Sequence, residues 1–304
     1  MSITPTRTTI ATSDLAGRVI SHREFFTEPD PTKSFDAVIE TLREFRLQNP
    51  RVEGVGVSLP GLVDPTTGTV VYVPYFQWRD LPIGDMIKSA IGLPVIIDND
   101  ANAVALAELW FGRPEVTDAR DFILVLVAEG VGTGIVFDGQ IYRGQCGAAG
   151  EFGHMIIAPD APVTCSCGNR DCWEAFSSEG AALARYSNLS GGSDRSPQNF
   201  RELVDRALAG EANAKSVLVD TACYLGIGIS NLVVGFNPAA VVVGGEIARA
   251  WALVEKSLTE TLEHSVRRGL PSAKILPSTL GEQPTLRGAL SLVLARKFAA
   301  AFAA

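Results

Sequence analysis

Strand-like and helix-like apolar patterns alternate along this chain in two successive rounds. In residue numbers, the expected strands are 7–12, 18–25 and 52–59 in the first round and 122–127, 133–137 and 140–143 in the second. Helical periodicity accompanies each round, and this mixture is typical of α/β proteins. The repetition predicts two similar lobes with a cleft between them, and a length of 304 residues is about that of two ordinary domains.

The charge balance excludes one class of function. The chain carries 26 Lys and Arg residues against 34 Asp and Glu residues, a net charge of −8. A surface that holds a polyanion by releasing counterions needs the opposite sign. We therefore do not expect this chain to grip DNA by itself.

The sequence also argues against export and membrane insertion. The first 20 residues are polar and Thr-rich, without the basic and then apolar order of a secretory signal. No uninterrupted apolar run reaches the roughly 18 residues that indicate a membrane span. The sequence predicts a soluble cytoplasmic protein with no membrane partner.

Three of the five cysteines crowd into eight positions. With an upstream histidine they form the pattern H-x10-C-x-C-x4-C, made of His154, Cys165, Cys167 and Cys172. Three thiolates and one imidazole suit tetrahedral Zn²⁺, and a full set of four protein ligands predicts a structural metal. The alternative is reduced cysteines in a tight loop, and Cys146 and Cys223 are interpreted as packing residues.

A polar cluster, Asp98-Asn99-Asp100-Ala101-Asn102, follows an apolar strand and opens a helix. Carboxylates at a strand end can be aimed into a crevice, where a general base must sit. The alternative is an N-cap cluster that satisfies the free amides of the helix. Capping needs one such side chain, so the cluster is richer than that role requires.

Two glycine segments can be interpreted in two ways. One runs from Glu129 to Gly134 between two expected strands, and the other is Gly244-Gly245 after a strand. Glycine lets backbone N–H groups approach a phosphate closely, but it also serves tight turns. Both interpretations stay open on local sequence alone.

Glu151 and Glu174 flank the candidate metal ligands. If a metal fixes this loop, the two carboxylates become held acceptor groups that suit sugar hydroxyls. The alternative is two solvated glutamates on a surface loop.

Taken together, these motifs resemble one family, the ROK proteins (repressors, uncharacterised reading frames and sugar kinases). The resemblance runs from about Arg7 to the C-terminus. The motifs that carry it are Pro60-Gly61-Leu62-Val63-Asp64, Asn99-Asp100-Ala101-Asn102, the glycine run to Gly134, Glu151-Phe152-Gly153-His154, the segment 165–174, Asn237-Pro238, Gly244-Gly245 and Arg287-Gly288-Ala289. The ordered set is highly specific, and its pattern is closest to the NagC-like transcriptional regulators of the family.

The resemblance implies an α/β, actin-like (RNase H-like) ATPase fold with two lobes that close over a sugar, usually as a homodimer or a dimer of dimers. The expected N-terminal lobe is 1–113, with its first strand largely missing and a C-terminal helix, about 285–304, packed back on it. The expected C-terminal lobe is 114–284, with the zinc loop and the oligomerisation surface.

The resemblance also implies roles for individual residues. Asp100 would be the base on the sugar 6-hydroxyl, and His154 would use one ring nitrogen for zinc and the other for the sugar. The residues implied to bind sugar are Asn99, Asp100, Glu151, His154 and Glu174. The residues implied to face the nucleotide in a kinase are Gly130, Gly132, Thr133, Gly134, Gly244 and Gly245.

Departures from the family pattern separate its branches. Kinases of the family open with a strand and Asp-x-Gly-Gly-Thr, which manages ATP phosphates and Mg²⁺, whereas this chain has Ser2-Ile3-Thr4-Pro5-Thr6. Ser2 cannot replace a carboxylate, and Pro5 has no amide hydrogen for a phosphate. In addition, Asp171 stands where the zinc loop usually has Gly, and Tyr75 where many kinases have Asn.

The leading hypothesis is the sugar-sensing and oligomerisation part of a ROK transcriptional regulator. Its ligand would be a monosaccharide or amino sugar, with or without a phosphate, and DNA would be contacted only through a winged-helix domain absent from this chain. The alternative is an ATP- and Mg²⁺-dependent hexose or N-acetylhexosamine kinase with Asp100 as the base. A third hypothesis is a scaffold that binds neither sugar nor nucleotide.

Overall fold

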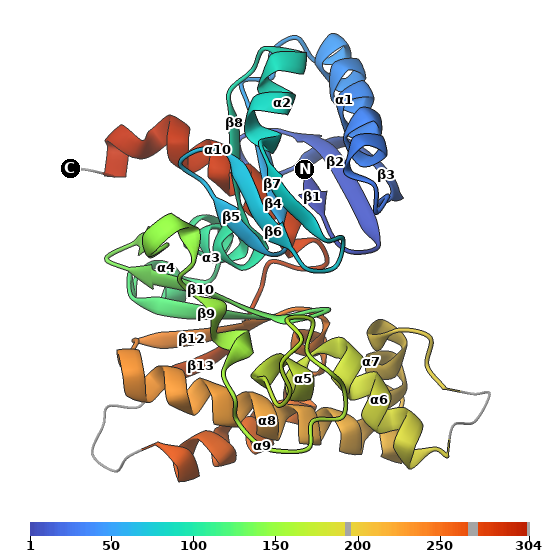
Figure 1. The fold of residues 1–304 in the computed structure, drawn as a ribbon. Coiled ribbons are helices and arrows are strands. Elements are labelled where there is room, and N and C mark those ends of the chain that lie inside the picture. Colours follow the sequence, from blue (N-terminus) through green and yellow to red (C-terminus); the bar gives the residue numbers. More distant parts are fainter. Residues whose placement is uncertain (192–195, 267–272, 303–304) are drawn as a thin grey trace. The chain divides into compact units, whose positions relative to one another are not determined.

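The computed structural model describes residues 1–191, 196–266 and 273–302. The chain divides into two compact units (Figure 1). The first unit contains Met1–Gly112, Ile141–Ala149 and Gln283–Ala304, and the second contains Arg113–Gln140 and Gly150–Glu282. The expected C-terminal helix reaches into residues 303–304, which lie outside the described residues. Nothing in the sequence marks the short stretch Ile141–Ala149 as part of the first unit.

The first unit has a mixed five-stranded sheet in the order β3-β2-β1-β4-β8. Its strands are β1 (Ser2–Ile3), β2 (Arg7–Ser13), β3 (Val19–Phe26), β4 (Val55–Leu59) and β8 (Val95–Asn99). A three-stranded sheet is formed by β5 (Leu62–Asp64), β6 (Thr69–Val73) and β7 (Trp78–Leu81). The helices are α1 (Pro31–Gln48), α2 (Ile83–Ile91), α3 (Asp100–Phe111), α10 (Pro284–Phe302) and the 3₁₀ turn η1 (Gln145–Gly147).

The second unit is built around a sheet in the order β11-β10-β9-β12-β13. Its strands are β9 (Phe122–Val127), β10 (Val131–Phe137), β12 (Ala240–Gly244) and β13 (Lys274–Pro277), with β11 (Gln140–Ile141) at the division between the units. Its helices are α4 (Pro114–Thr117), α5 (Trp173–Ser177), α6 (Glu179–Leu189), α7 (Phe200–Leu208), α8 (Ala212–Phe236) and α9 (Trp251–Ser265), with 3₁₀ turns η2 (Glu151–His154) and η3 (Glu246–Ala250).

The two large sheets have the same internal arrangement. In the first unit β1 pairs antiparallel with β2 and parallel with β4, and β4 pairs parallel with β8. In the second unit β9 pairs antiparallel with β10 and parallel with β12, and β12 pairs parallel with β13. The turn at residues 4–6, between β1 and β2, is therefore the topological equivalent of the turn at residues 128–130, between β9 and β10.

Local sequence explains the first helix and the first hairpin. The carboxylate of Asp30 caps α1 by accepting from the backbone N–H groups of Thr32 and Lys33, and Pro31 stands at the first helical position, where its missing N–H costs nothing. The apolar face of α1, which includes Phe35 and Val38, is buried in the core of the first unit. The expected strands 7–12 and 18–25 are present as the antiparallel pair β2 and β3, and α1 follows them from Pro31.

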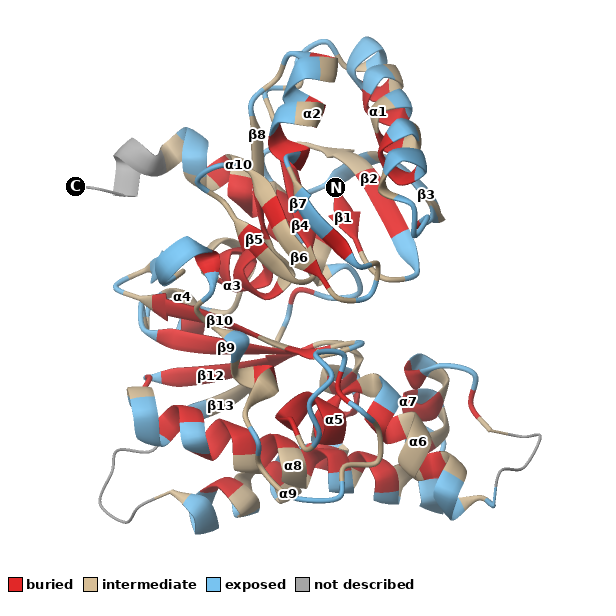
Figure 2. Cartoon of the chain, viewed as in Figure 1, coloured by how far each residue is buried: buried red, intermediate tan, exposed pale blue. Residues whose placement is uncertain are grey.

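The core of the second unit lies between its sheet and its helices (Figure 2). All six residues of β9 are buried, as are Leu225 and Ile229 of α8. Among the described residues α8 is long and apolar enough to cross a membrane, but most of that stretch is buried inside the unit. Its composition is that of a central core helix.

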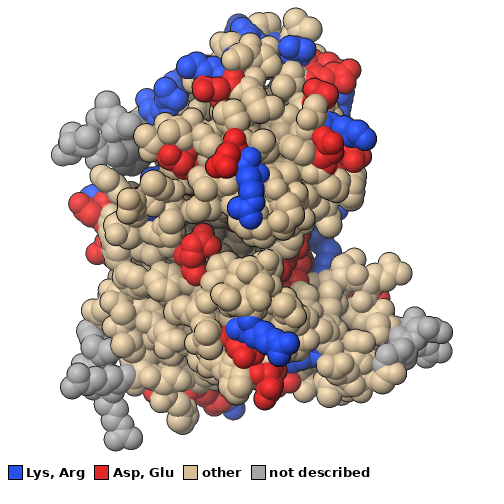
Figure 3. Space-filling model, in the orientation of Figure 1, with Lys and Arg blue, Asp and Glu red and all other residues tan. Residues whose placement is uncertain are grey.

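Charged side chains of both signs are interspersed on the face drawn in Figure 3. The described residues also form surface ion pairs such as Arg7–Glu24 (3.1 Å) and Arg23–Glu44 (2.7 Å). Such pairs contribute little stability individually, and the face in Figure 3 shows no broad patch of positive charge.

We predict that Gly228→Ala lowers the free energy of unfolding by about 1–3 kcal/mol. A methyl group there would lie 2.0 Å from Cε2 of the Trp173 indole, which is fully buried and cannot withdraw. Gly235→Ala in the same helix is the control, because nothing lies within 4 Å of the added methyl group. The control should be neutral or stabilise by about 0.5–1 kcal/mol through helix propensity. Urea denaturation of both variants is the measurement, and equal midpoints would contradict the packing argument.

Candidate functional site

The polar cluster of the first unit lies at the carboxyl end of β8, where α3 begins. The side-chain oxygen of Asn99 caps α3 by accepting from the N–H groups of Ala101 (2.8 Å) and Asn102 (3.3 Å). Its amide nitrogen donates to the carbonyl of Gly61 (3.0 Å), in the turn after β4. Asn99 therefore has the capping role and also ties together the ends of two neighbouring strands. Asp100, the first residue of α3, is half-buried beside it.

An ion pair between the buried Asp98 and Arg143 stabilises the junction between β8 and α3. The side chain of Asp98 is 2% exposed, and its Oδ2 lies 2.8 Å from both Nε and Nη2 of Arg143. Its Oδ1 accepts from the Asn99 N–H (2.9 Å) and from the Asn102 side-chain amide (3.1 Å). A buried carboxylate with four donors is well compensated. Asp98 is thus a structural anchor for the two residues that follow it.

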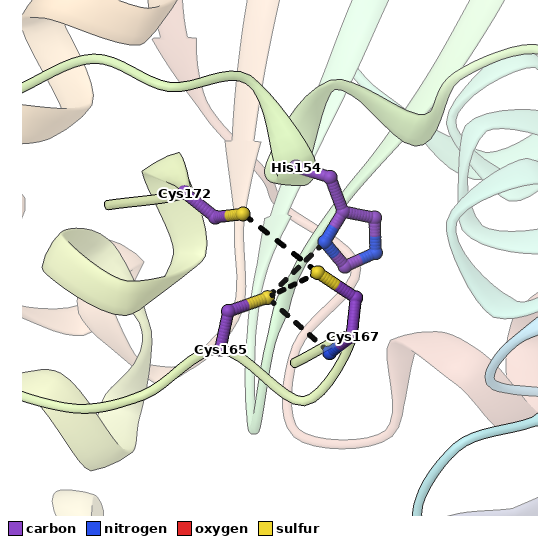
Figure 4. A group of neighbouring side chains, drawn as sticks. All are labelled: His154, Cys165, Cys167 and Cys172. Carbon is purple, nitrogen blue, oxygen red and sulfur yellow. Dashed lines mark hydrogen bonds between the residues drawn. The ribbon is translucent and has the colours of Figure 1, made fainter. Parts of the chain in front are cut away.

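The four candidate metal ligands converge in the second unit (Figure 4). Their ligand atoms all lie within 4.8 Å of one another, with Nδ1 of His154 3.3 Å from the sulfur of Cys165. The sulfur of Cys167 lies 3.2 Å from that of Cys165 and 3.8 Å from that of Cys172. Zn–S bonds of about 2.3 Å at tetrahedral angles would place the sulfurs roughly 3.8 Å apart, so the donor set fits Zn²⁺.

Main-chain contacts join the two ends of the metal loop. Trp173 N–H donates to Met155 O (2.7 Å), and Ile156 forms a β-bridge with Cys172. Asp171 adopts a left-handed backbone conformation (φ 67°), which explains why glycine is usual at this position and why aspartate is tolerated. The departure from the family pattern therefore leaves the ligand geometry intact.

Glu174 is held inside the metal loop. Its side chain is buried, and Oε1 accepts from the Ser166 hydroxyl (2.9 Å), the Ser166 N–H (3.3 Å) and the Cys165 thiol (2.8 Å). The interpretation of Glu174 as a solvated surface residue is therefore wrong. Burial, and then the neighbouring Glu174 carboxylate, raise the pKa of the Cys165 thiol, and burial likewise raises that of Cys172. A bound zinc ion would stabilise both thiolates.

Glu151 lies on the other side of the histidine. Its Oε2 is 3.6 Å from Nε2 of His154, so one ring nitrogen faces the cysteines and the other faces this carboxylate. Partial removal from water raises the pKa of Glu151, while the charge of His154 acts against this shift and that of Glu174 adds to it. This arrangement gives the imidazole two distinct neighbours, as a ligand shared by metal and sugar would require.

The glycine run differs from its expected form. Gly132, Thr133 and Gly134 are part of strand β10, paired with Leu126, Val125 and Leu124 of β9. The expected strand 133–137 includes Thr133 and Gly134, whereas Gly132 was expected in the loop before it, so the strand begins earlier than expected. Only the start of the run, with Gly130, forms the turn, where Ala128 N–H donates to Gly130 O (2.9 Å). Thr133 Oγ1 donates to the carbonyl of Gly150 at 2.5 Å.

Gly244 ends β12, and Gly245 follows it with φ 98°. A side chain at Gly245 would lie 1.9 Å from the carbonyl oxygen of Val127. Glycine is therefore required for close packing of the β12 end against the β9 end, which supports the turn interpretation here. Gly245, which follows β12, therefore lies directly against Val127 at the end of β9.

Three glutamates gather at this place, which the sequence interpretation missed. The N–H of Glu179, the first residue of α6, donates to Ala128 O (2.9 Å), beside Glu129. Burial, followed by the charges of Glu129 and Glu246, raises the pKa of Glu179 to about 8. Glu246 has arginine neighbours, Arg249 at 3.0 Å and Arg201 at 3.6 Å. No local sequence pattern predicts this glutamate cluster, because its three members come from the β9–β10 turn, α6 and η3.

The sequence-predicted residues thus fall into two groups. Asn99 and Asp100 are adjacent in the first unit, while Glu151, His154 and Glu174 lie with the cysteines in the second. Asp98 and Arg143 were not selected from the sequence as site residues. Only the tertiary structure brings Arg143 to Asp98, 45 residues earlier in the chain.

Comparison with known proteins gives a consistent result. The model of the ROK family matches residues 2–296. The xylose repressor of Bacillus spizizenii (strain ATCC 23059 / NRRL B-14472 / W23) is 31% identical over 290 residues, which cover 93% of this chain and 73% of the repressor.

Two solved structures match almost the whole chain. A ROK family transcriptional regulator, a homologue of the E. coli MLC protein, superposes with a TM-score of 0.86 at 28% identity over 97% of this chain and 77% of that chain. A ROK family glucokinase from Streptomyces griseus, in complex with glucose and AMPPNP, gives 0.84 at 29% identity over 97% and 98%. The expected α/β, actin-like ATPase fold is confirmed.

We predict that the purified protein holds about one zinc ion per chain and that Cys167→Ser removes it, because three ligands bind zinc far more weakly than four. Cys223→Ser is the matched control, since Cys223 lies on α8 outside the ligand set. Metal analysis by mass spectrometry after dialysis is the measurement. Zinc-free wild-type protein, or equal zinc in both variants, would refute the metal assignment.

Stability should depend on pH through Glu179. Its pKa in the folded protein, about 8, exceeds the ordinary value of 4.5, so the folded state retains a proton that the unfolded state releases. The free energy of unfolding should therefore fall as pH rises from about 4.5 to about 8. Glu179→Gln should raise the melting temperature by about 2–5 °C near pH 8.5 and by less near pH 5. Exposed Glu115→Gln is the control, and a shift independent of pH would argue against this role.

Proposed function

Because the chain belongs to the ROK family, we propose that it binds a monosaccharide as the sugar-sensing part of a transcriptional regulator. The family includes both repressors and glucokinases, so the branch has to be argued from the residues themselves. The observation that carries the choice is the chemistry of two equivalent turns, one in each unit.

Each turn joins the first two strands of a five-stranded sheet. In the first unit, at residues 4–6, Pro5 has no N–H to offer a phosphate. In the second unit, at residues 128–130, Glu129 places a carboxylate beside Glu179 and Glu246. Phosphoryl transfer depends on positioning and on neutralising negative charge. One turn is short of a donor and the other adds negative charge, which supports a sensor over a kinase.

The sugar would be recognised by the residues that the resemblance implies. Asp100 and Asn99 would offer polar groups from the start of α3, and Glu151 and His154 would offer them from η2. Carboxylate and amide oxygens accept from sugar hydroxyl groups, and an imidazole N–H donates to a hydroxyl oxygen, so the set suits several hydroxyls on one ring. His154, Cys165, Cys167 and Cys172 would hold Zn²⁺, which would fix the loop that carries Glu174 and orient the imidazole.

Sensing would follow from differential affinity. A sugar that binds one arrangement of the chain more tightly shifts the population toward it, and an attached DNA-reading segment would respond to that shift. We propose a homodimer or homotetramer as the sensing species.

The observation that favours the kinase alternative is Asp100, the first residue of α3, which lies at the carboxyl end of β8. A carboxylate there could serve as the base on a sugar hydroxyl. This alternative requires ATP turnover, which the sensor does not.

Calorimetry of the zinc-loaded protein with D-xylose, D-glucose and N-acetyl-D-glucosamine tests the proposal. We expect saturable binding of at least one sugar, and about 10–100-fold weaker binding by Asp100→Ala, because a hydrogen bond to a charged group is lost. A parallel ADP-release assay with ATP and Mg²⁺ should stay at background. Turnover that disappears in Asp100→Ala would establish the kinase instead, and no binding of any sugar would refute both.

A further inference from the structure

One short stretch of chain changes unit twice. Strand β10 belongs to the second unit, Ile141–Ala149 belongs to the first, and the chain returns to the second at Gly150, immediately before Glu151. Below, Ile141–Ala149 is called the crossing segment. It precedes one group of implied sugar-binding residues directly in the sequence, and within the first unit it contacts Asp98, the residue immediately before the other group.

The crossing segment is fixed to the first unit by one charged side chain and one close packing contact. The charged contact is the pair of 2.8 Å interactions between Arg143 and Oδ2 of Asp98. The packing contact is at Gly147, where a methyl group would lie 2.0 Å from the carbonyl oxygen of Val63 in β5. Gly147 has φ 76°, so only glycine fits there without strain.

The segment is also closed on itself and held at its far end. Ala149 N–H donates to Arg143 O (3.0 Å), so the main chain at Arg143 sets the position of the last residue of the segment. The next residue, Gly150, receives the Thr133 hydroxyl. The chain between the Arg143 anchor and Glu151 therefore has little freedom.

The other effect of Arg143 is on the β8–α3 junction. Asp98 uses Oδ1 to hold the Asn99 N–H and the Asn102 side chain, while Arg143 satisfies Oδ2. Without the guanidinium, the buried Asp98 carboxylate would lose its charged partner, which is costly and would displace the side chain. That displacement would disturb the turn that presents Asn99 and Asp100.

We propose that Arg143 is a positioning residue for sugar binding, fixing Asn99 and Asp100 through Asp98 and Glu151 through the crossing segment. This inference rests on the proposed function. Arg143 itself need not touch the sugar. Its effect on the second group runs along the main chain and requires no side-chain contact with Glu151.

The test compares Arg143→Met with the wild type by calorimetry, using the sugar that the wild type binds best. We expect Arg143→Met to bind the sugar at least about tenfold more weakly than the wild type. Its zinc content should be unchanged, because the metal ligands lie in the other unit. Arg143→Lys keeps the charge and should recover part of the affinity. Arg51→Met, which removes an exposed arginine of the first unit, is the control and should bind like the wild type.

Hydrogen exchange gives a readout that does not depend on sugar. In Arg143→Met, peptides that cover 98–102 and 141–150 should exchange faster, while the peptide that covers 165–172 should not change. A global loss of protection would indicate general destabilisation and would count against a positioning role.

If Arg143→Met does not fold, the double variant Arg143→Met with Asp98→Asn takes its place in the binding test. The double variant removes both charges and leaves no uncompensated carboxylate. Weak sugar binding by this folded variant supports the proposal. Affinity equal to that of the wild type, in either variant, overturns it and reduces Arg143 to a partner of a buried charge. Failure of the wild type to bind any sugar refutes the proposed function itself, and the sugar role of Arg143 with it.

Discussion

The parallel pairing of strands determines which polar side chains lie close together in each unit. The parallel pair of β4 and β8 ends at Leu59 and Asn99, and Asn99 reaches across to the turn after β4. In the second unit, the parallel pair of β9 and β12 brings Gly245, which follows β12, against Val127 at the end of β9. Because neighbouring parallel strands finish on the same edge, polar residues that are distant in sequence meet there without any local signal.

Buried charge is handled differently at the two edges. At the β4–β8 edge, the Asp98 carboxylate has hydrogen-bond donors on both oxygens inside the first unit. At the β9–β12 edge, Glu179 is partly buried next to other carboxylates, and its pKa rises to about 8. The first arrangement stabilises a fixed geometry, and the second makes the environment unfavourable for a further anion. This contrast, more than the fold, is what favours the proposed sugar sensor over a nucleotide-dependent kinase.

Much of this architecture can be predicted from the sequence, for definite physical reasons. The hairpin of β2 and β3, the amphipathic helix α1 and the apolar strand β9 follow from periodicity and turn chemistry. The metal ligands follow from residue type and spacing, because four soft donors so close together have few other uses. The start of α3 was predicted as a cap or a site, and Asn99 has the capping role.

Other features depend on packing that a linear pattern does not contain. Gly132 was expected in the loop before strand 133–137, yet it pairs with Leu126 of β9, because the strand needs no large side chain at this position. The ion pair of Arg143 with Asp98 joins residues 45 positions apart, and the glutamate cluster joins three elements. Such contacts are fixed by the fold as a whole, so they become visible only in three dimensions.

The place of Trp173 has a consequence for how the metal loop can evolve. This residue follows the ligand Cys172 directly, its indole N–H donates to Tyr224 O (3.0 Å), and its ring lies over Gly228 in the middle of α8. The Trp173 indole therefore anchors the C-terminal end of the loop in the hydrophobic interior, while residues 158–164 lie nearer the surface. That outer stretch can change in length or sequence without disturbing this anchor, as long as Trp173 and Gly228 are preserved together.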